Sequence, residues 1–340
     1  MRAGNAPEAP PSSSSTAQRP AGEPVKLAFF LVPQFSLMAF SSAIEPLRAA
    51  NRLSGRSLYE WQLASLDGQP VAASNGVPIG VHAALDALEQ PDMLVVCAGL
   101  EPLQLAGNRR LHHRLRRLAR HGCRIGAISG GSFILADAGL LTNRLCTVHW
   151  EYNELFASRY PDLKQTQDLY VVDRDVFTCS GGIAALDMML HFVREQCGPE
   201  LALAVAEQFL HPRIREQGDD QRMELHARYG VHDPKLVEVI RLMESTIDSP
   251  LYVQAIAARV GLSPRQVERL FRQHIGEPPG PFYLRLRLER GRTLLAQTSQ
   301  SIQEVALACG FGSTSHFAHA YKRHYQHTPT DERRRPARTR

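Results

Sequence analysis

The first part of the chain alternates short apolar runs with amphipathic stretches. Residues 25–32, 92–98 and 124–128 are β-prone, largely apolar runs that end at Pro, Gly or Ser, a pattern typical of strands buried in a parallel sheet. Residues 109–121 place leucines on one face and arginines on the other, which predicts a basic amphipathic helix. Strands that alternate with helices in this way predict an α/β domain with a mostly parallel sheet sandwiched by helices.

One of these strands ends in a sharp turn. In the segment 126–131 the strand meets Ser129 and then two glycines before a helix begins, which predicts an elbow that presents Ser129 at the carboxyl edge of the sheet. Ligands of open parallel sheets bind at that edge. His149 follows a further short apolar run and is expected to approach the same crevice, with Trp150 beside it.

The last part of the chain is helical in pattern and repeats itself. Between residues 251 and 329, one helix pattern ends at Gly261 and another at Gly310, and Gly is the residue best able to adopt the left-handed conformation of a tight interhelix turn. Phe271 and Tyr321 then close two further, mostly polar helices. The repeat predicts an all-α domain of two tandem helix-turn-helix units.

Helix-start signals mark both units. Ser263 precedes Gln266, and Ser301 precedes Glu304, with the spacing of a capping box. The helix expected to connect the units, over residues 282–297, contains Gly291. Gly costs a helix about 1 kcal/mol relative to Ala, so either close packing demands it or the helix is softened there.

The polar helix that ends each unit is expected to face outward and to bind DNA. Its outward residues are Arg265, Glu268 and Arg269 in the first unit, and Thr314, Ser315, His316, His319, Lys322 and Arg323 in the second. Arg can make a bidentate bond to guanine and Glu can accept a bond from cytosine, so the first unit favours sequence readout. The second unit, poorer in such residues, favours anchoring to the DNA backbone.

The charge of the chain follows the same division. From Pro234 onward there are 17 Lys and Arg against 9 Asp and Glu, whereas the part before it has 22 against 25. The excess positive charge therefore lies on the repeat domain, as is expected of a domain that binds double-stranded DNA. Two ordinary helical hairpins are the alternative, which the repeat, the caps and the charge together disfavour.

These patterns predict two domains. We expect a sensing domain over residues 25–210 and a DNA-binding domain over 234–330, with a linker at 211–233, a disordered tail at 1–24 and a basic tail at 331–340. No apolar run approaches the roughly 20 residues of a membrane span. The six scattered cysteines lack a CxxC pair, so we expect reduced thiols in a cytoplasm and neither a metal nor a cofactor.

The two halves together resemble a known family. The C-terminal part resembles the AraC/XylS transcription regulators, and the chain apart from its tail resembles their GlxA-type subgroup. In that subgroup the DNA-binding domain follows a PfpI-like domain of the class I glutamine-amidotransferase fold, which is flavodoxin-like. Residues 44–55, 65–68, 147–150 and 179–182 are similar to regulators of glycine betaine, carnitine and arginine catabolism.

The resemblance implies a transcription regulator, and an activator of catabolic genes. Its implied partners are promoter DNA, RNA polymerase, a second copy of the chain bound through the N-terminal domain, and a small effector such as a betaine, carnitine or an amino acid. The first recognition helix would reach base edges through Arg265, Glu268 and Arg269. The expected effector-binding residues are Glu45, Gly99, Ser129, Gly130, His149 and Trp150.

The elbow departs from the family of enzymes it resembles. PfpI-like enzymes carry a cysteine nucleophile where this chain has Ser129, and a Ser hydroxyl needs a positioned base. His149 is the candidate base, but no carboxylate partner for it is visible in the sequence. We therefore expect a vestigial site that binds without catalysis. Two alternatives stay open: a hydrolase or amidase using Ser129 and His149, and an N-terminal domain that serves only for dimerisation.

Overall fold

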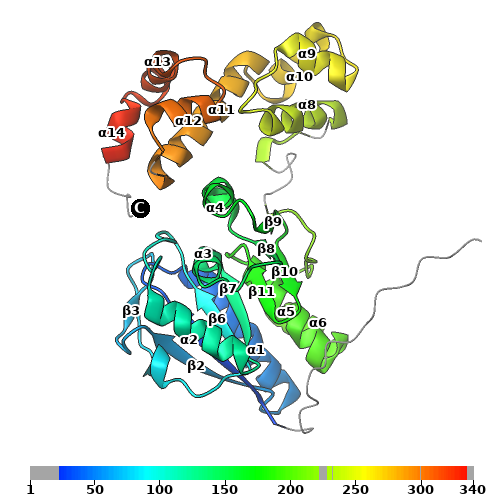
Figure 1. The fold of residues 1–340 in the computed structure, drawn as a ribbon. Coiled ribbons are helices and arrows are strands. Elements are labelled where there is room, and N and C mark those ends of the chain that lie inside the picture. The colour runs from blue at the N-terminus through cyan, green and yellow to red at the C-terminus, as the bar shows by residue number, and fades with distance from the viewer. Residues whose placement is uncertain (1–22, 222–227, 232, 299, 335–340) are drawn as a thin grey trace, which may run out of the picture.

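The computed structural model describes residues 23–221, 228–231, 233–298 and 300–334, which form two bodies (Figure 1). The larger body is built on a sheet that is parallel except at one edge, where β10 and β11 form an antiparallel hairpin. Its strands, in spatial order, are β10 (Tyr170–Asp173), β11 (Val176–Cys179), β7 (Arg124–Ile128), β6 (Met93–Cys97), β1 (Val25–Leu31), β2 (Tyr59–Ser65) and β5 (Ala83–Ala84). The predicted α/β domain with a mostly parallel sheet is confirmed.

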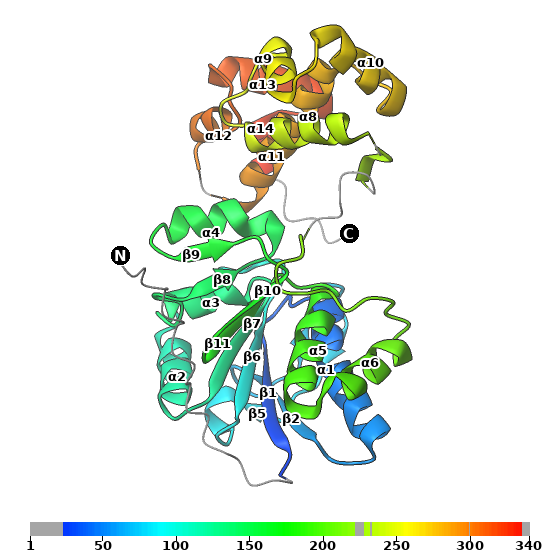
Figure 2. The same ribbon diagram turned by 90° about the vertical axis from the view of Figure 1, so that its right-hand side faces the viewer.

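Helices cover both faces of this sheet, as Figure 2 shows. Side chains of β1 alternate between two cores: Phe29 packs on one side and Phe30 on the other, and both are fully buried. The Phe29 side holds α1 (Leu37–Ser54), α5 (Ala184–Cys197) and α6 (Pro199–Gln208). The Phe30 side holds α2 (Arg109–Arg120), α3 (Gly131–Asp137) and α4 (Asn153–Arg159).

Short elements surround the carboxyl edge of the sheet. They are β3 (Val71–Ala72), β4 (Pro78–Ile79), β8 (Leu145–Thr147), β9 (Lys164–Thr166), and the 3-10 turns η1 (Leu85–Ala87) and η2 (Trp150–Tyr152). The sequence patterns did not predict α4 and β9. They have seven and three residues, fewer than the roughly 11 residues of a helix and the roughly 4 of a strand over which a hydrophobic period can be recognised. Strand β9 is held by its pairing with β8.

The smaller body is all helical. Its helices are α8 (Pro234–Ser245), α9 (Val253–Val260), α10 (Pro264–His274), α11 (Pro279–Gln297), α12 (Ile302–Ala308), α13 (Thr314–Tyr325) and α14 (Pro329–Arg334). Helices α9 and α10 form one helix-turn-helix unit and α12 and α13 form the other. Both predicted capping boxes are present, and Gly261 and Gly310 adopt the left-handed conformation, with φ of 74° and 71°. The tandem repeat is confirmed.

The C-terminal end of the helical body differs from expectation. The stretch 331–340 was expected to be a basic tail, but α14 continues to Arg334 and its Glu332 is buried. Glu332 accepts hydrogen bonds from Tyr321 and Arg292 and also pairs with His327, which fastens α14 to α13 and α11. Residues 1–22 of the expected N-terminal tail, 222–227 and 232 of the expected linker, and 335–340 lie outside the described residues. No described helix is long and apolar enough to cross a membrane.

Close packing explains Gly291 in the connecting helix. A Cβ atom added there would lie 2.8 Å from the ring of Phe317, which is fully buried in the core of the second unit. The helix is therefore intact at this position, and the missing side chain lets α13 approach α11. Gly310 serves the same purpose, because a Cβ there would lie 2.4 Å from Pro250 in the segment between α8 and α9.

Replacing Gly291 with Ala is expected to destabilise the protein even though Ala favours helices. Overpacking against the Phe317 ring costs about 1–3 kcal/mol, more than the gain of about 1 kcal/mol from helix propensity. Urea unfolding of Gly291→Ala and Gly280→Ala measures the difference. Gly280 lies in the same helix with nothing within 4 Å of an added Cβ, so its variant should be as stable as the parent or more so. Equal effects at both positions would contradict the packing explanation.

Candidate effector site and nucleic-acid interface

The predicted elbow is present and strained. Ser129 follows β7 directly and adopts a left-handed backbone conformation with φ of 57°, which is unfavourable for a residue with a side chain. Its amide donates to the carbonyl of Cys179, and its side chain is buried, with 7% of its surface exposed. This is the backbone geometry of a nucleophile elbow.

Glycines let the neighbouring turns close around the elbow. A Cβ on Gly181 would lie 2.9 Å from the Cβ of Ser129, and a Cβ on Gly130 would lie 3.1 Å from the carbonyl oxygen of Gly99. Gly99 in turn packs against the backbone of Gln34, which follows β1. Turns after four neighbouring strands thus meet at one point of the carboxyl edge.

His149 reaches the same corner through Tyr152. The Tyr152 hydroxyl donates to the Gly99 carbonyl at 3.1 Å, and the His149 ring lies 6.0 Å from the Tyr152 ring and 5.5 Å from that of Trp150. Burial lowers the pKa of His149 below its ordinary value, although Glu151 partly opposes this. The imidazole is therefore neutral near pH 7. Tyr152 therefore links His149 and Trp150 to Gly99, and Gly99 packs against the turn of Ser129 and Gly130.

Glu45 lies apart from this group. It is eight residues beyond the first residue of α1, about 12 Å along the helix axis. Its carboxylate accepts a hydrogen bond from Arg48 at 2.7 Å and is 43% exposed. Among the described residues, no contact joins Glu45 to the elbow.

His149 has a carboxylate neighbour that the sequence did not reveal, Glu151, 3.6 Å from its Nδ1 atom, but among the described residues no hydrogen bond joins the imidazole to Ser129. Within the described part of the chain, the Ser129 hydroxyl makes no hydrogen bond, and the Nδ1 atom of His149 accepts from the amide of Glu151. The nearby thiols offer no substitute: burial raises the pKa of Cys179 to about 12 and that of Cys97 further, which keeps both protonated. Among the described residues, no base contacts the Ser129 hydroxyl.

A buried charge cluster, not predicted from the sequence, lies beneath the elbow. Asp187 on α5 is fully buried, and its carboxylate accepts hydrogen bonds from the amide and guanidinium of Arg215, at 2.6–2.9 Å. The Nε2 atom of His211 lies 2.8 Å from the same carboxylate. The start of the expected linker is thus fixed to the sensor domain. Asp187 is the one polar residue in the first seven positions of α5, which are otherwise apolar, and this is the signal that could have found it.

Gln221 fastens the same connector beside the candidate site. Its side-chain amide donates to the hydroxyl of Thr147 and to the carbonyls of Val148 and Asp168, at 2.8–3.0 Å. Thr147 and Val148 immediately precede His149. The first half of the connector therefore follows the sensor domain to within contact of the effector corner.

A direct ion pair joins the two bodies. The Nε atom of Arg290 on α11 lies 2.8 Å from the carboxylate of Glu154 on α4. Burial raises the pKa of Glu154, and Arg290 opposes this by stabilising its charged form. A cleft of about 670 Å³ lies beside the pair and is lined by residues of both bodies, including Trp150 and Arg241. Trp150, alone among the predicted effector-binding residues, thus borders the same cleft as the helix that connects the two recognition units.

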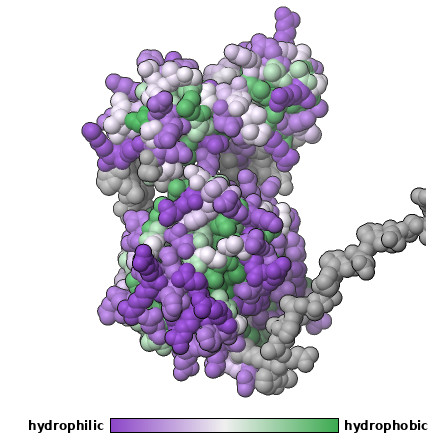
Figure 3. Space-filling view, in the orientation of Figure 1, coloured by the Kyte–Doolittle hydropathy of each residue, from purple (hydrophilic) through white to green (hydrophobic). Residues whose placement is uncertain are grey.

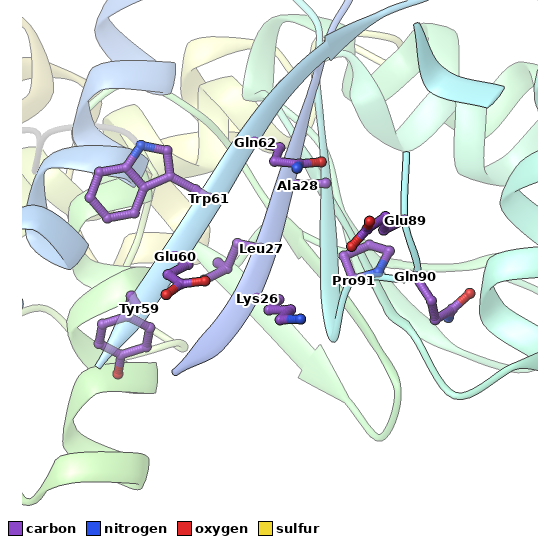
Figure 4. A pocket seen from close by; sticks show the side chains of 10 residues that line it. All are labelled: Lys26, Leu27, Ala28, Tyr59, Glu60, Trp61, Gln62, Glu89, Gln90 and Pro91. Atoms are coloured by element: carbon purple, nitrogen blue, oxygen red, sulfur yellow. The ribbon is translucent and has the colours of Figure 1, made fainter. Parts of the chain in front are cut away.

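A second hollow lies at the opposite end of the strands. It has a volume of about 440 Å³, and Figure 4 shows Lys26, Glu60, Trp61 and Gln62 around it. None of the residues predicted for effector binding lines it.

The recognition residues are free to contact DNA. Arg265, Glu268 and Arg269 are exposed on α10, and none of them pairs with a carboxylate or cation among the described residues. On α13 the exposed residues are Ser315, His316, His319, Lys322 and Arg323, while Thr314 is half-buried. Arg272, which was not predicted, is also exposed on α10. Val267 and Phe317 turn inward and hold the two helices in place.

Comparisons with known proteins agree with both halves. The DJ-1/PfpI family matches residues 25–195, and a helix-turn-helix domain family matches residues 256–335. The HTH-type transcriptional regulator CdhR of Pseudomonas aeruginosa is 45% identical over 90% of this chain and 90% of its own length. The chain belongs to the GlxA-type HTH transcriptional regulators. GlxA of Rhizobium meliloti is 42% identical over 91% of this chain and 96% of its own.

A solved structure supports the fold of this GlxA-type regulator. An AraC family transcriptional regulator from Pseudomonas putida, 31% identical, is covered completely by 55% of this chain with a TM-score of 0.50. The relatives of this chain are named as transcriptional regulators, and the DJ-1/PfpI fold is one domain of a DNA-binding protein.

Replacing Asp187 with Asn should destabilise the protein strongly, because it leaves the half-buried guanidinium of Arg215 and the imidazole of His211 without their carboxylate partner. Removing one partner of a buried pair costs about 3–5 kcal/mol. Asp86→Asn is the matched control, since Asp86 pairs with Arg110 on the surface, where an ion pair contributes at most about 1 kcal/mol. Urea unfolding of the two variants measures the difference, and similar small losses would show that the cluster is not a structural anchor.

Proposed function

We propose that this regulator activates catabolic genes in response to a small nitrogenous metabolite such as a betaine, carnitine or an amino acid. The observation that carries the proposal is that one chain combines two features. The first is an elbow whose serine has no base, near a neutral His149 and the indole of Trp150. The second is a pair of outward-facing recognition helices. The proposed setting is a cytoplasm, with promoter DNA and RNA polymerase as macromolecular partners and a second copy bound through the N-terminal domain.

The effector is proposed to bind at the corner formed by Gly99, Ser129, Gly130, His149 and Trp150. Trp150 offers an aromatic face to a quaternary ammonium group. The buried Ser129 hydroxyl offers a hydrogen bond to a carboxylate. The same two groups suit a zwitterion, which is the chemistry that betaines, carnitine and amino acids share. Glu45 would join the site only if α1 or its side chain moved, because it pairs with Arg48.

Two contacts support a route from this corner to the DNA-binding domain. Glu154, four residues after Trp150, binds Arg290 on α11, the helix that joins the two recognition units. Gln221 bonds the connector to the residues before His149. A ligand that displaced Trp150 would act on both contacts at once. The proposal is that this displacement changes how the helical body presents its two units.

DNA contact is proposed to be unequal between the units. In the first unit, Arg269 and Arg265 are suited to base edges; in the second, the Ser, Thr and His residues are suited to the backbone. Two recognition helices on one chain would enter successive major grooves about 34 Å apart on one face of the duplex.

Arg269→Ala should weaken binding to a duplex selected by the full-length protein by about 1–3 kcal/mol and relax its preference at one base pair. His319→Ala should instead weaken binding to selected and unselected duplexes alike. Fluorescence anisotropy with both duplexes measures this, with Arg52→Ala, an exposed arginine of the sensor domain, as the control that changes neither. Loss of base preference in His319→Ala but not in Arg269→Ala would reverse the proposed division.

Thermal shift with glycine betaine, dimethylglycine, carnitine, choline and arginine tests the effector class. A ligand at 100 times its Kd adds about 2.7 kcal/mol to stability and should raise the Tm measurably. Trp150→Ala should remove the shift, while Trp61→Ala, at the hollow of Figure 4, should keep it. No shift with any of the five compounds would remove this effector class and favour a domain that serves only for dimerisation.

The enzymatic alternative has a separate test. Incubation with acyl and amide substrates should give no turnover by the parent protein, since the Ser129 hydroxyl has no base partner. Turnover that disappears in Ser129→Ala would establish a hydrolase.

A further inference from the structure

Helix α2 of the sensor domain concentrates positive charge. Its twelve residues, Arg109–Arg120, contain six arginines and two histidines and no Asp or Glu, although the chain before Pro234 is acidic in total. Figure 3 shows hydrophilic side chains gathered over this helix. A solvated helix face ordinarily mixes both signs, because opposite charges three or four residues apart stabilise it and like charges do not. The charge of α2 therefore needs a partner outside the helix.

Some of these arginines already have a partner in the fold. Arg114 donates to the carbonyls of Leu85 and Leu88, and Arg116 donates to that of Ala138. Arg110 pairs with Asp86. The inner face of α2 is buried through Leu111, Leu115 and Leu118.

The remaining outer arginines have no such partner. Arg109, Arg117 and Arg120 are exposed, and none of their guanidinium groups lies within 4.0 Å of a carboxylate in the described part of the chain. The three define what we call the α2 arginine stripe. It spans the twelve residues of α2, so its first and last residues are about 16 Å apart along the helix axis. Each strand of a duplex carries a phosphate about every 3.4 Å of its axis, so the stripe is long enough to meet several phosphates.

The chemistry of this face favours a nucleic-acid backbone over an acidic protein. Stable protein interfaces have an apolar, often aromatic centre. The described outer face of α2 exposes no large hydrophobic residue. Phosphate contacts need none, because they gain free energy by releasing counterions and are made by planar guanidinium groups.

We propose that the α2 arginine stripe is a second, sequence-independent contact surface for the DNA that the helix-turn-helix domain binds. The inference rests on the proposed DNA-binding function and extends the footprint to the sensor domain. Helices α10 and α13 lie in the helical body, whereas α2 lies on the flank of the other body (Figures 1 and 2). DNA flanking the recognition site must therefore curve along that flank to reach the stripe.

Binding to two duplexes of different length tests this. A short duplex carries only the site selected by the full-length protein, and a long duplex carries the same site with extended flanks on both sides. The triple variant Arg109→Gln, Arg117→Gln, Arg120→Gln should bind the short duplex like the parent protein and the long duplex about tenfold more weakly. On the long duplex, the slope of log K against log[KCl] should fall by about 2–3, since each phosphate contact contributes about 0.9.

Two further variants make the result specific. The first is a triple control variant that removes the same charge from exposed positions away from α2: Arg52→Gln, Arg56→Gln, Arg174→Gln. It should bind both duplexes like the parent protein. The second keeps the charge of the stripe: Arg109→Lys, Arg117→Lys, Arg120→Lys. It should retain most of the salt dependence of binding to the long duplex. The parent protein should also bend the long duplex, measured by gel mobility of circularly permuted fragments, and the Gln variant should bend it less.

The outcomes separate the stripe from the DNA-binding function itself. Equal affinity of the parent protein and the α2 Gln variant for the long duplex would overturn the proposed DNA contact of the stripe. This holds even if the variant lost transcription activation, because such a loss would point to a protein partner. Loss of binding to both duplexes would also overturn it, because the effect would not depend on flanking DNA. Failure of the parent protein to select any duplex would instead contradict the proposed function.

Discussion

One buried carboxylate determines where the chain can leave the sensor domain. Asp187 has no exposed surface, and a charged group in that position is tolerated only when it is fully paired. His211 and Arg215 supply the pairing from the connector. The connector therefore runs back over α5 before it turns toward the DNA-binding body. That course places Gln221 against the strand that leads to His149.

Close approach of backbones shapes both halves of the protein. At the elbow, Gly99, Gly130 and Gly181 let turns after neighbouring strands pack directly on Ser129. In the helical body, Gly291 and Gly310 let the second unit pack on the connecting helix and on the first unit. The first arrangement has the backbone of a nucleophile elbow, but the Ser129 hydroxyl makes no hydrogen bond among the described residues, and burial keeps the nearby Cys179 thiol protonated. The second makes two units one body, so a contact on α11 acts on both.

Charge separates the roles of the two bodies and also connects them. The recognition helices carry unpaired arginines, while the sensor domain is acidic except along α2. Arg290 reaches across to Glu154, at the edge of the cleft that Trp150 also lines. Glu154 lies on α4, which follows the turn of Trp150, and Arg290 lies on α11, which follows α10, so this ion pair joins the helices next to the proposed ligand site and the first recognition helix.

The sequence by itself determined the architecture of each half. Buried runs, the Ser129 elbow, the Gly261 and Gly310 turns and the capping boxes are set by interactions within a few residues, so local patterns identify them. Only the tertiary structure decided that Glu45 lies away from the elbow, that Asp187 holds the connector, that α14 completes the helical body, and that α4 meets α11. These contacts join residues far apart in the chain through single charged or polar groups, and no local periodicity encodes which distant partner such a group will find.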